Sequence, residues 1–226
     1  MARLARLCIP GWPHLVVQRG HDRRPVCLDD DDRQLFRDLL REAARLNEVR
    51  VHAYGLFETE VRLLATPSTP DGLSKLIQAI GRRYVARFNR RHGRSGGLWE
   101  GRFRATVIDP VPYLLPCMLY VEGADAEPGL LPDAQAWSSA AHHLGFRLDP
   151  LVTDAAAYWG LGNTPFEREA AYRSLYQQAL TDKQLVEIRA ALKASWPLGD
   201  EHFRLRLAGE TSRRLIPRPR GRPRAI

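Results

Sequence analysis

Two consecutive runs of sequence, VHAYGLF at residues 51–57 and EVRLLAT at residues 60–66, decide the fold of this chain. Both runs are rich in β-branched, aromatic and aliphatic residues, which is typical of strands. Only Glu58 and Thr59 separate them, and the turn-forming sequence TPSTP at residues 66–70 closes the second run. We therefore predict a β-hairpin over residues 51–66.

The sequence on either side of this hairpin predicts a β-α-β-β-α-β order. Four aspartates, Asp29–Asp32, precede apolar residues at helical spacing as far as Leu46, and acidic residues favour the start of a helix. We interpret them as a helix start rather than a metal site. Further strands are predicted at residues 14–19 and 103–108, and further helices at residues 73–88 and 113–122. The predicted fold class is α+β, a ferredoxin-like antiparallel sheet with helices against one face.

From about Pro150 onward the sequence predicts helices only. The clearest periodic segments are residues 167–180 and 182–195, followed by a shorter one near residues 200–207. We divide the chain into a sheet domain at residues 1–132, a helical region at residues 133–212 and a disordered Arg/Pro-rich tail at residues 213–226.

The composition is that of a folded protein without a membrane segment. The chain has 226 residues, of which 44% are hydrophobic, enough for a core. No apolar run approaches the ~20 residues that a membrane span needs, and no apolar segment of a signal peptide follows the first arginines. The three cysteines, Cys8, Cys27 and Cys117, form no CxxC pair. This pattern predicts neither a disulfide framework nor a zinc site, and it favours a reducing compartment such as the cytoplasm.

The positive charge is concentrated in two segments. The chain has 34 basic and 26 acidic residues, a net charge of +8, and only three of the basic residues are lysines. Residues 81–104 contain eight arginines and one acidic residue. Residues 213–226 contain six arginines and no acidic residue. A GC-rich genome also favours arginine over lysine, but it does not explain this clustering. The planar guanidinium suits phosphate, so we predict a nucleic-acid partner.

Aromatic residues alternate with the arginines of residues 82–104, as in grooves that bind single-stranded nucleic acid. Tyr84 and Phe88 share the apolar stripe of the predicted helix and are expected in the core, which leaves Trp99 as the candidate for stacking on bases. The tail sequence PRGRP at residues 219–223 resembles an AT-hook, although simple electrostatic attachment explains it equally well. The candidate DNA-binding residues are Arg19, Arg23, Arg82, Arg83, Arg87, Arg90, Arg91, Trp99, Arg102, Arg104, Arg220 and Arg222.

Several short motifs, taken together and in order, resemble the REP-associated tyrosine transposases, a branch of the single-tyrosine HUH transposases. The main one is HAYGLFETEVRLLATP at residues 52–67. The others are CIPG (8–11), QRG (18–20), GRRY (81–84), LWEGRF (98–103), YLL (113–115), Tyr120, WSS (137–139), WPLG (196–199) and GRPR (221–224).

This resemblance implies a domain that binds single-stranded or hairpin DNA and cuts and rejoins it. In the family, two histidines on one strand and a third ligand hold Mg²⁺ or Mn²⁺, and a tyrosine on a later helix attacks phosphorus. The tyrosine position is Tyr120 here, whereas the ligand positions are Glu60, Arg62 and Ala124. Arginine cannot ligate a metal, so Arg62 is expected to neutralise Glu60 or to contact phosphate directly. The resemblance therefore implies no bound metal, with Mg²⁺ or Mn²⁺ needed only if the altered site is still active.

Three interpretations follow from this altered site. The first is a transposase-like protein that binds single-stranded or hairpin DNA, has lost strand cleavage and is able to form a homodimer. The second is an active tyrosine transposase that makes a phosphotyrosine–DNA intermediate through Tyr120 in a rebuilt site. The third is a decayed relic without function, whose arginines reflect genome composition alone. Only the second predicts a covalent adduct between Tyr120 and DNA.

Overall fold

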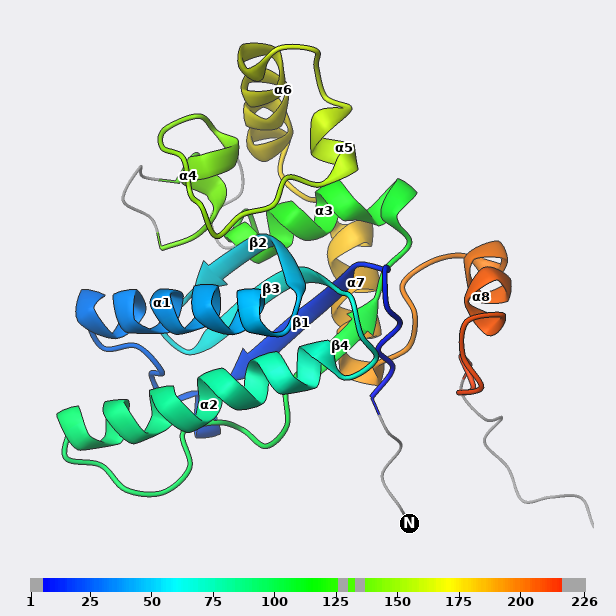
Figure 1. The fold of residues 1–226 in the computed structure, drawn as a ribbon. Helices are drawn as coiled ribbons and strands as arrows, with labels where there is room; N and C mark the ends of the chain where they lie inside the picture. The colour runs from blue at the N-terminus through cyan, green and yellow to red at the C-terminus, as the bar shows by residue number, and fades with distance from the viewer. Residues whose placement is uncertain (1–5, 126–129, 133–136, 217–226) are drawn as a thin grey trace, which may run out of the picture.

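The central feature of the molecule is a four-stranded antiparallel sheet in the order β2-β3-β1-β4 (Figure 1). The structure is a computed structural model and describes residues 6–125, 130–132 and 137–216. The strands are β1 (His14–Arg19), β2 (Val49–Leu56), β3 (Glu60–Pro67) and β4 (Arg104–Val107). This order and the α+β class confirm the predicted ferredoxin-like fold.

The β2-β3 hairpin is the predicted one with shifted boundaries. Strand β2 begins at Val49 rather than at residue 51, because Val49 pairs with Pro67 at the far end of β3. An irregularity between Val51 and Ala53 shifts the register within the hairpin. Both strands are buried along almost their whole length, because elements cover both faces of the sheet.

Helices α1 (Asp30–Leu46) and α2 (Gly72–Arg91) lie side by side on one face of the sheet (Figure 1). Phe36 and Leu40 from α1 and Tyr84 and Phe88 from α2 are buried there. The expected core positions of Tyr84 and Phe88 are thereby confirmed. The arginines of α2 lie on the exposed surface of the helix, away from this core.

The opposite face of the sheet is also covered, which the prediction of helices against one face did not include. Helices α3 (Pro110–Glu122) and α7 (Asp182–Ala194) pack there. Helix α3 begins at Pro110 rather than at the predicted residue 113. Asp109 caps it by accepting a hydrogen bond from the Val111 N–H, and proline suits the first turn of a helix.

The remaining elements lie at the periphery of the sheet and its helix layers (Figure 1). They are the 3-10 turn η1 (His21–Arg23) and the helices α4 (Ala140–His143), α5 (Ala156–Trp159), α6 (Pro165–Gln178) and α8 (Glu201–Ala208). Helices α4 and α5 have four residues each, too few to show a helical period in the sequence. Helices α6, α7 and α8 match the predicted segments within two residues.

The predicted tail falls partly within the described residues. Leu215 is buried in a small cluster with Leu7, Phe203 and Leu207, so the chain is packed against the molecule at that point. Arg220 and Arg222 lie outside the described residues. None of the described helices is both long enough and apolar enough to span a bilayer.

Candidate nucleic-acid interface

Strand pairing places three side chains in a row across the sheet. Arg62 on β3 and Arg104 on β4 both lie opposite Val17 on β1, and Glu60 lies opposite Arg19. Directly opposed residues of antiparallel strands share a face, and residues two apart on a strand do so as well. Val17 packs in the same cluster as Tyr120, so this face is the one that α3 covers.

Arg62 is the centre of an ion-pair network on this face. Its Nε donates to Glu60 Oε1 at 2.6 Å, and its Nη1 donates to Asp125 Oδ1 at 2.5 Å and to the Tyr120 backbone oxygen at 2.6 Å. Its guanidinium also lies 4.6 Å from the ring centroid of Phe57 and 4.3 Å from that of Tyr120. The structure therefore brings Glu60, Arg62 and Tyr120 together, as the family resemblance implied.

Two further arginines surround this network. The Nε of Arg19 donates to Glu60 Oε2 at 2.7 Å, and the Nη2 of Arg189 on α7 donates to Asp125 Oδ2 at 3.1 Å. Burial alone would raise the pKa of Glu60, but the Arg62 and Arg19 guanidiniums outweigh it and hold that pKa below its ordinary value. Both oxygens of each carboxylate are therefore hydrogen-bonded to guanidinium groups.

A cationic cavity of about 340 Å³ lies beside the network. Its described lining is Val17, Arg19, Arg104, Tyr120, Arg189, Leu192 and Lys193. Four of these side chains are cationic, and no described carboxylate lines the cavity. Arg19 and Arg189 each bind a carboxylate outside the lining, whereas Arg104 and Lys193 have no acidic partner among the described residues. We call this space the Tyr120 cavity.

Helix α7 supplies one wall of the Tyr120 cavity. Arg189 and Lys193 are four residues apart, so they lie on the same face of the helix. The Nη1 of Arg104 donates to the Lys193 backbone oxygen at 3.3 Å, which fixes β4 to the end of α7. In Figure 1, α7 lies beside β1 and β4, behind the sheet in this view.

Tyr120 is itself 2% exposed, and burial raises the pKa of its hydroxyl even though Arg62 acts in the opposite direction. The hydroxyl is therefore protonated at neutral pH. No described residue hydrogen-bonds it, and the nearby carboxylates Glu60 and Asp125 are both occupied by arginines. A general base for this hydroxyl is thus absent from the described residues.

The residues at the ligand positions do not fit a divalent metal. Arg62 takes the place between the two carboxylates that a cation would occupy, and it remains protonated at any relevant pH. Ala124 is buried in the apolar cluster of α3, and its neighbour Asp125 faces Arg62 instead. A divalent ion would have to displace a guanidinium that is held by Glu60, Asp125 and the Tyr120 carbonyl.

Two other groups of metal-ligand side chains occur in the described residues, Asp29–Asp32–His92 and His142–His143–Asp154. In the second, His142 Nδ1 accepts a hydrogen bond from the Asp149 N–H. His142 Nε2 therefore carries the proton that it donates to Asp154 at 3.1 Å. This nitrogen offers no lone pair to a metal, so hydrogen bonding explains the group.

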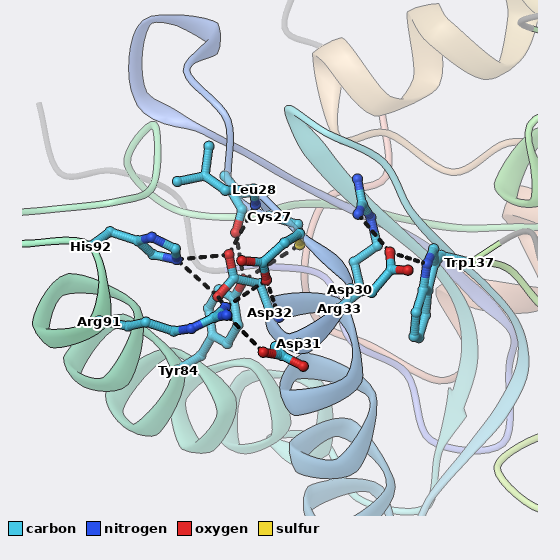
Figure 2. A network of polar contacts seen from close by, with 12 residues as sticks. Cys27, Leu28, Asp30, Asp31, Asp32, Arg33, Tyr84, Arg91, His92 and Trp137 are labelled. Atoms are coloured by element: carbon cyan, nitrogen blue, oxygen red, sulfur yellow. Dashed lines mark hydrogen bonds and ion pairs between the residues drawn. The ribbon is translucent and has the colours of Figure 1, made fainter.

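The first group is an ion-pair network at the start of α1 (Figure 2). Arg91 donates to Asp29 at 2.5 Å, to Asp31 at 2.7 Å and to Asp32 at 2.9 Å, and His92 contacts Asp32 at 2.9 Å. Asp29 also caps the helix by accepting from the Asp32 N–H. The interpretation of the four aspartates as a helix start is confirmed, and Arg91 is paired with three of them.

The other predicted DNA-binding residues lie in three places. Arg82, Arg87 and Arg90 are exposed on α2, across the sheet from Tyr120, and Arg83 pairs with Glu42 on α1 at 2.6 Å. Arg23 is exposed in η1. Arg19 and Arg104 line the Tyr120 cavity, and Arg102 lines a neighbouring cavity.

Trp99 lies at the edge of the core on the α1-α2 side. Its ring stacks on Tyr84, with centroids 6.2 Å apart, and meets Phe36 edge-on at 6.4 Å. It is half-buried, so only part of its surface is accessible to a base. The structure does not bring Trp99 to the Tyr120 cavity.

Sequence reasoning missed three residues of this site. Asp125 directly follows a ligand position and was not expected to reach it. Arg189 and Lys193 lie on a helix that carries no motif, about seventy residues from Tyr120 along the chain. Their spacing of four residues on a helix is the one signal that the sequence offered, and it does not reveal where the helix packs.

Comparison with solved structures finds a similar fold in one transposase structure. The chain is similar to a REP-associated tyrosine transposase solved with a REP hairpin bound, with a TM-score of 0.52 and 18% identity over 70% of this chain and 96% of that one. A Deinococcus radiodurans R1 protein described as a candidate transposase gives a TM-score of 0.37 and 23% identity, over 48% of this chain and 87% of that one. No family profile and no curated protein matches the sequence. The first of these similarities establishes the fold.

Proposed function

We propose that the chain is a transposase-like DNA-binding protein of the REP-associated type, which holds a backbone phosphate of single-stranded or hairpin DNA in the Tyr120 cavity without a divalent metal. The carrying observation is the lining of that cavity, four cations with no described carboxylate among them. Guanidinium and ammonium groups that converge on one space are suited to phosphate.

The choice of single-stranded or hairpin DNA rests on the fold neighbour and on the depth of the site. The solved transposase with the same fold was bound to a REP hairpin. Tyr120 is 2% exposed at the cavity, so a phosphate must enter between β1, β4 and α7 to reach it. A flexible single strand, such as an unpaired flank of a hairpin, adapts to such an entry more easily than a rigid duplex does.

Binding without cleavage is the form of this function that the chemistry favours. The Tyr120 hydroxyl has a raised pKa and no described base, and Arg62 fills the place of a metal.

The described cysteines are all free thiols, which supports a reducing compartment such as the cytoplasm.

A binding titration tests the proposal with a matched pair of α7 variants. Lys193 lines the Tyr120 cavity, whereas Lys183 is 84% exposed on the same helix, so Lys193→Gln and Lys183→Gln remove the same charge from different places. Fluorescence anisotropy with a labelled hairpin that carries a single-stranded flank should show about tenfold weaker binding for Lys193→Gln. The slope of log K against log salt concentration should also fall by about 0.7. Binding should be unchanged by EDTA.

The outcomes separate the proposal from its alternatives. Equal effects of the two lysine variants, or a loss of binding in EDTA, contradict the proposal. A covalent adduct on a denaturing gel with Mn²⁺, absent in Tyr120→Phe, would establish the active transposase. Equally weak binding to hairpin, single strand and duplex would favour the decayed relic.

A further inference from the structure

A second cationic cavity adjoins the Tyr120 cavity. It has a volume of about 580 Å³ and lies between the start of the described chain, the loop before β4, the end of α7 and the residues after α8. Its charged lining comprises Arg6, Glu100, Arg102, Arg104, Lys193 and Arg213, together with His21. Five permanently cationic side chains therefore face one carboxylate, and Arg104 and Lys193 line both cavities.

Arg213 is the unusual member of this second cavity. Its Nε and Nη1 are shielded from solvent and have no hydrogen-bond partner among the described residues. Burial lowers the pKa of Arg213, but a guanidinium stays protonated in proteins. A shielded, charged donor without an acceptor is unfavourable unless an anion binds it.

The chain holds Arg213 in place from both sides. Its backbone N–H donates to Thr211 Oγ1 at 3.1 Å, and Leu215, two residues further, is buried against Phe203 and Leu207. The backbone that carries Arg213 is therefore already in place when a ligand arrives, which lowers the entropic cost of binding.

Other cations of the cavity are positioned as well. The Nε of Arg6 donates to the Phe103 backbone oxygen at 3.2 Å, and its guanidinium lies 3.7 Å from the ring centroid of Phe103. Arg104 is held by the carbonyl of Lys193. The printed acceptor of Arg104 is a neutral carbonyl, so this contact leaves its positive charge available to an anion.

From these observations we infer that the second cavity, here called the Arg213 cavity, is a second phosphate site, which binds another phosphate of the DNA strand whose backbone occupies the Tyr120 cavity. The shared walls Arg104 and Lys193 make the two sites consecutive along one strand. This inference rests on the proposed function, because the strand is the one assigned to the Tyr120 cavity. The bound group is either an internal phosphodiester or a 5′-terminal phosphate.

The test compares two adjacent arginines. Arg214 is exposed and does not line the cavity, so Arg213→Gln and Arg214→Gln make the same change of charge one residue apart. With the hairpin substrate and fluorescence anisotropy, Arg213→Gln should weaken binding about tenfold and lower the salt slope by about 0.7. Arg214→Gln should have less than half of that effect. Equal effects of the two variants would overturn the second site.

A further variant keeps the two proposals apart. Arg189 lines the Tyr120 cavity alone, so Arg189→Gln reports on the proposed function in the same titration. If Arg189→Gln binds the hairpin more weakly and Arg213→Gln does not, only the second phosphate site is overturned. If neither variant changes the affinity, both the second site and the proposed function are overturned. Weaker binding in Arg213→Gln but not in Arg189→Gln supports the phosphate site at Arg213 and overturns the placement of the strand in the Tyr120 cavity.

Two more measurements identify the phosphate and control for folding. If a 5′-phosphate on the flank strengthens binding to the wild type but not to Arg213→Gln, the site takes a terminal phosphate. If it strengthens binding to both proteins equally, the site takes an internal phosphodiester. Inorganic phosphate should raise the Tm of the wild type and of Arg214→Gln more than that of Arg213→Gln. If Arg213→Gln proves unstable, Arg213→Lys retains the charge, and it should keep most of the salt slope while losing part of the affinity.

Discussion

Arg62 lies between Glu60 and Asp125 with its side chain 12% exposed, and Asp125 is 5% exposed. A cation in this position allows two largely buried carboxylates to stay ionised close to each other. The same guanidinium also holds the backbone of Tyr120 at 2.6 Å. Arg62 therefore has a positioning role in this site, because its charge is already balanced and is not available for a phosphate.

Removing this charge should destabilise the fold. In Arg62→Met the two carboxylates lose their shared partner, and breaking a buried ion pair from one side costs about 3 kcal/mol. Urea unfolding followed by circular dichroism at neutral pH measures this loss in the free energy of unfolding.

A neutral version of the same network is the control. In the triple variant Glu60→Gln/Arg62→Met/Asp125→Asn no buried charge remains unpaired, so it should recover at least half of the stability that Arg62→Met loses. If Arg62→Met is as stable as the wild type, the network contributes little to stability and Tyr120 is positioned by packing alone.

At the scale of elements, the approach of α3 to β2 depends on Gly55. A Cβ at this position would meet the Val121 carbonyl oxygen at less than a normal contact distance, and two ring atoms of Phe57 at 2.7 and 2.9 Å. Val121 directly follows Tyr120, so the same contact sets the height of the tyrosine above the sheet. Glycine is required here because a helix backbone lies against the strand.

We predict that Gly55→Ala destabilises the chain by about 2 kcal/mol, since a backbone oxygen cannot move aside without shifting α3. Differential scanning calorimetry measures the change, and the hairpin titration should show weaker binding because the Tyr120 cavity is disturbed. Gly97→Ala is the matched control, because nothing lies within 4 Å of a Cβ at that exposed position. If the two variants have the same Tm, the close approach does not constrain α3.

Sequence patterns predicted the elements better than they predicted the site. Apolar periodicity identified α1, α2, α3 and the three longer C-terminal helices, because each buries a stripe of its surface. Runs of β-branched, aromatic and aliphatic residues identified β1 and the hairpin. The arginines of residues 82–104 are adjacent in sequence, but α2 carries most of them across the sheet from Tyr120. The cations of the Tyr120 cavity come from β1, β4 and α7, and only tertiary packing brings these together.

At the scale of the whole molecule, a buried polar cluster joins the sheet part to the C-terminal helices. Glu122 at the end of α3 accepts hydrogen bonds from Ser139 and from Nδ1 of His143 at 2.5 Å each, and from the Tyr172 hydroxyl on α6 at 2.7 Å. The apolar cluster around α3 likewise contains Leu15 from β1 and Ile188 from α7. Residues 6–125 and 137–216 therefore share one core, and we expect them to unfold together, although the sequence suggested a boundary near residue 132.

Tyr172→Phe tests this coupling. The substitution leaves a Glu122 carboxylate oxygen without its donor in the interior, at a cost of about 2 kcal/mol. Hydrogen exchange measured in urea should show α1 and α6 losing protection together, at a lower urea concentration than in the wild type. Tyr158→Phe is the matched control: its buried hydroxyl donates to the neutral His143 carbonyl, so the loss should be about half as large. If α6 loses protection while α1 keeps it, the helical region is a separate folding unit, and the α7 wall of the Tyr120 cavity is then able to detach while the sheet stays folded.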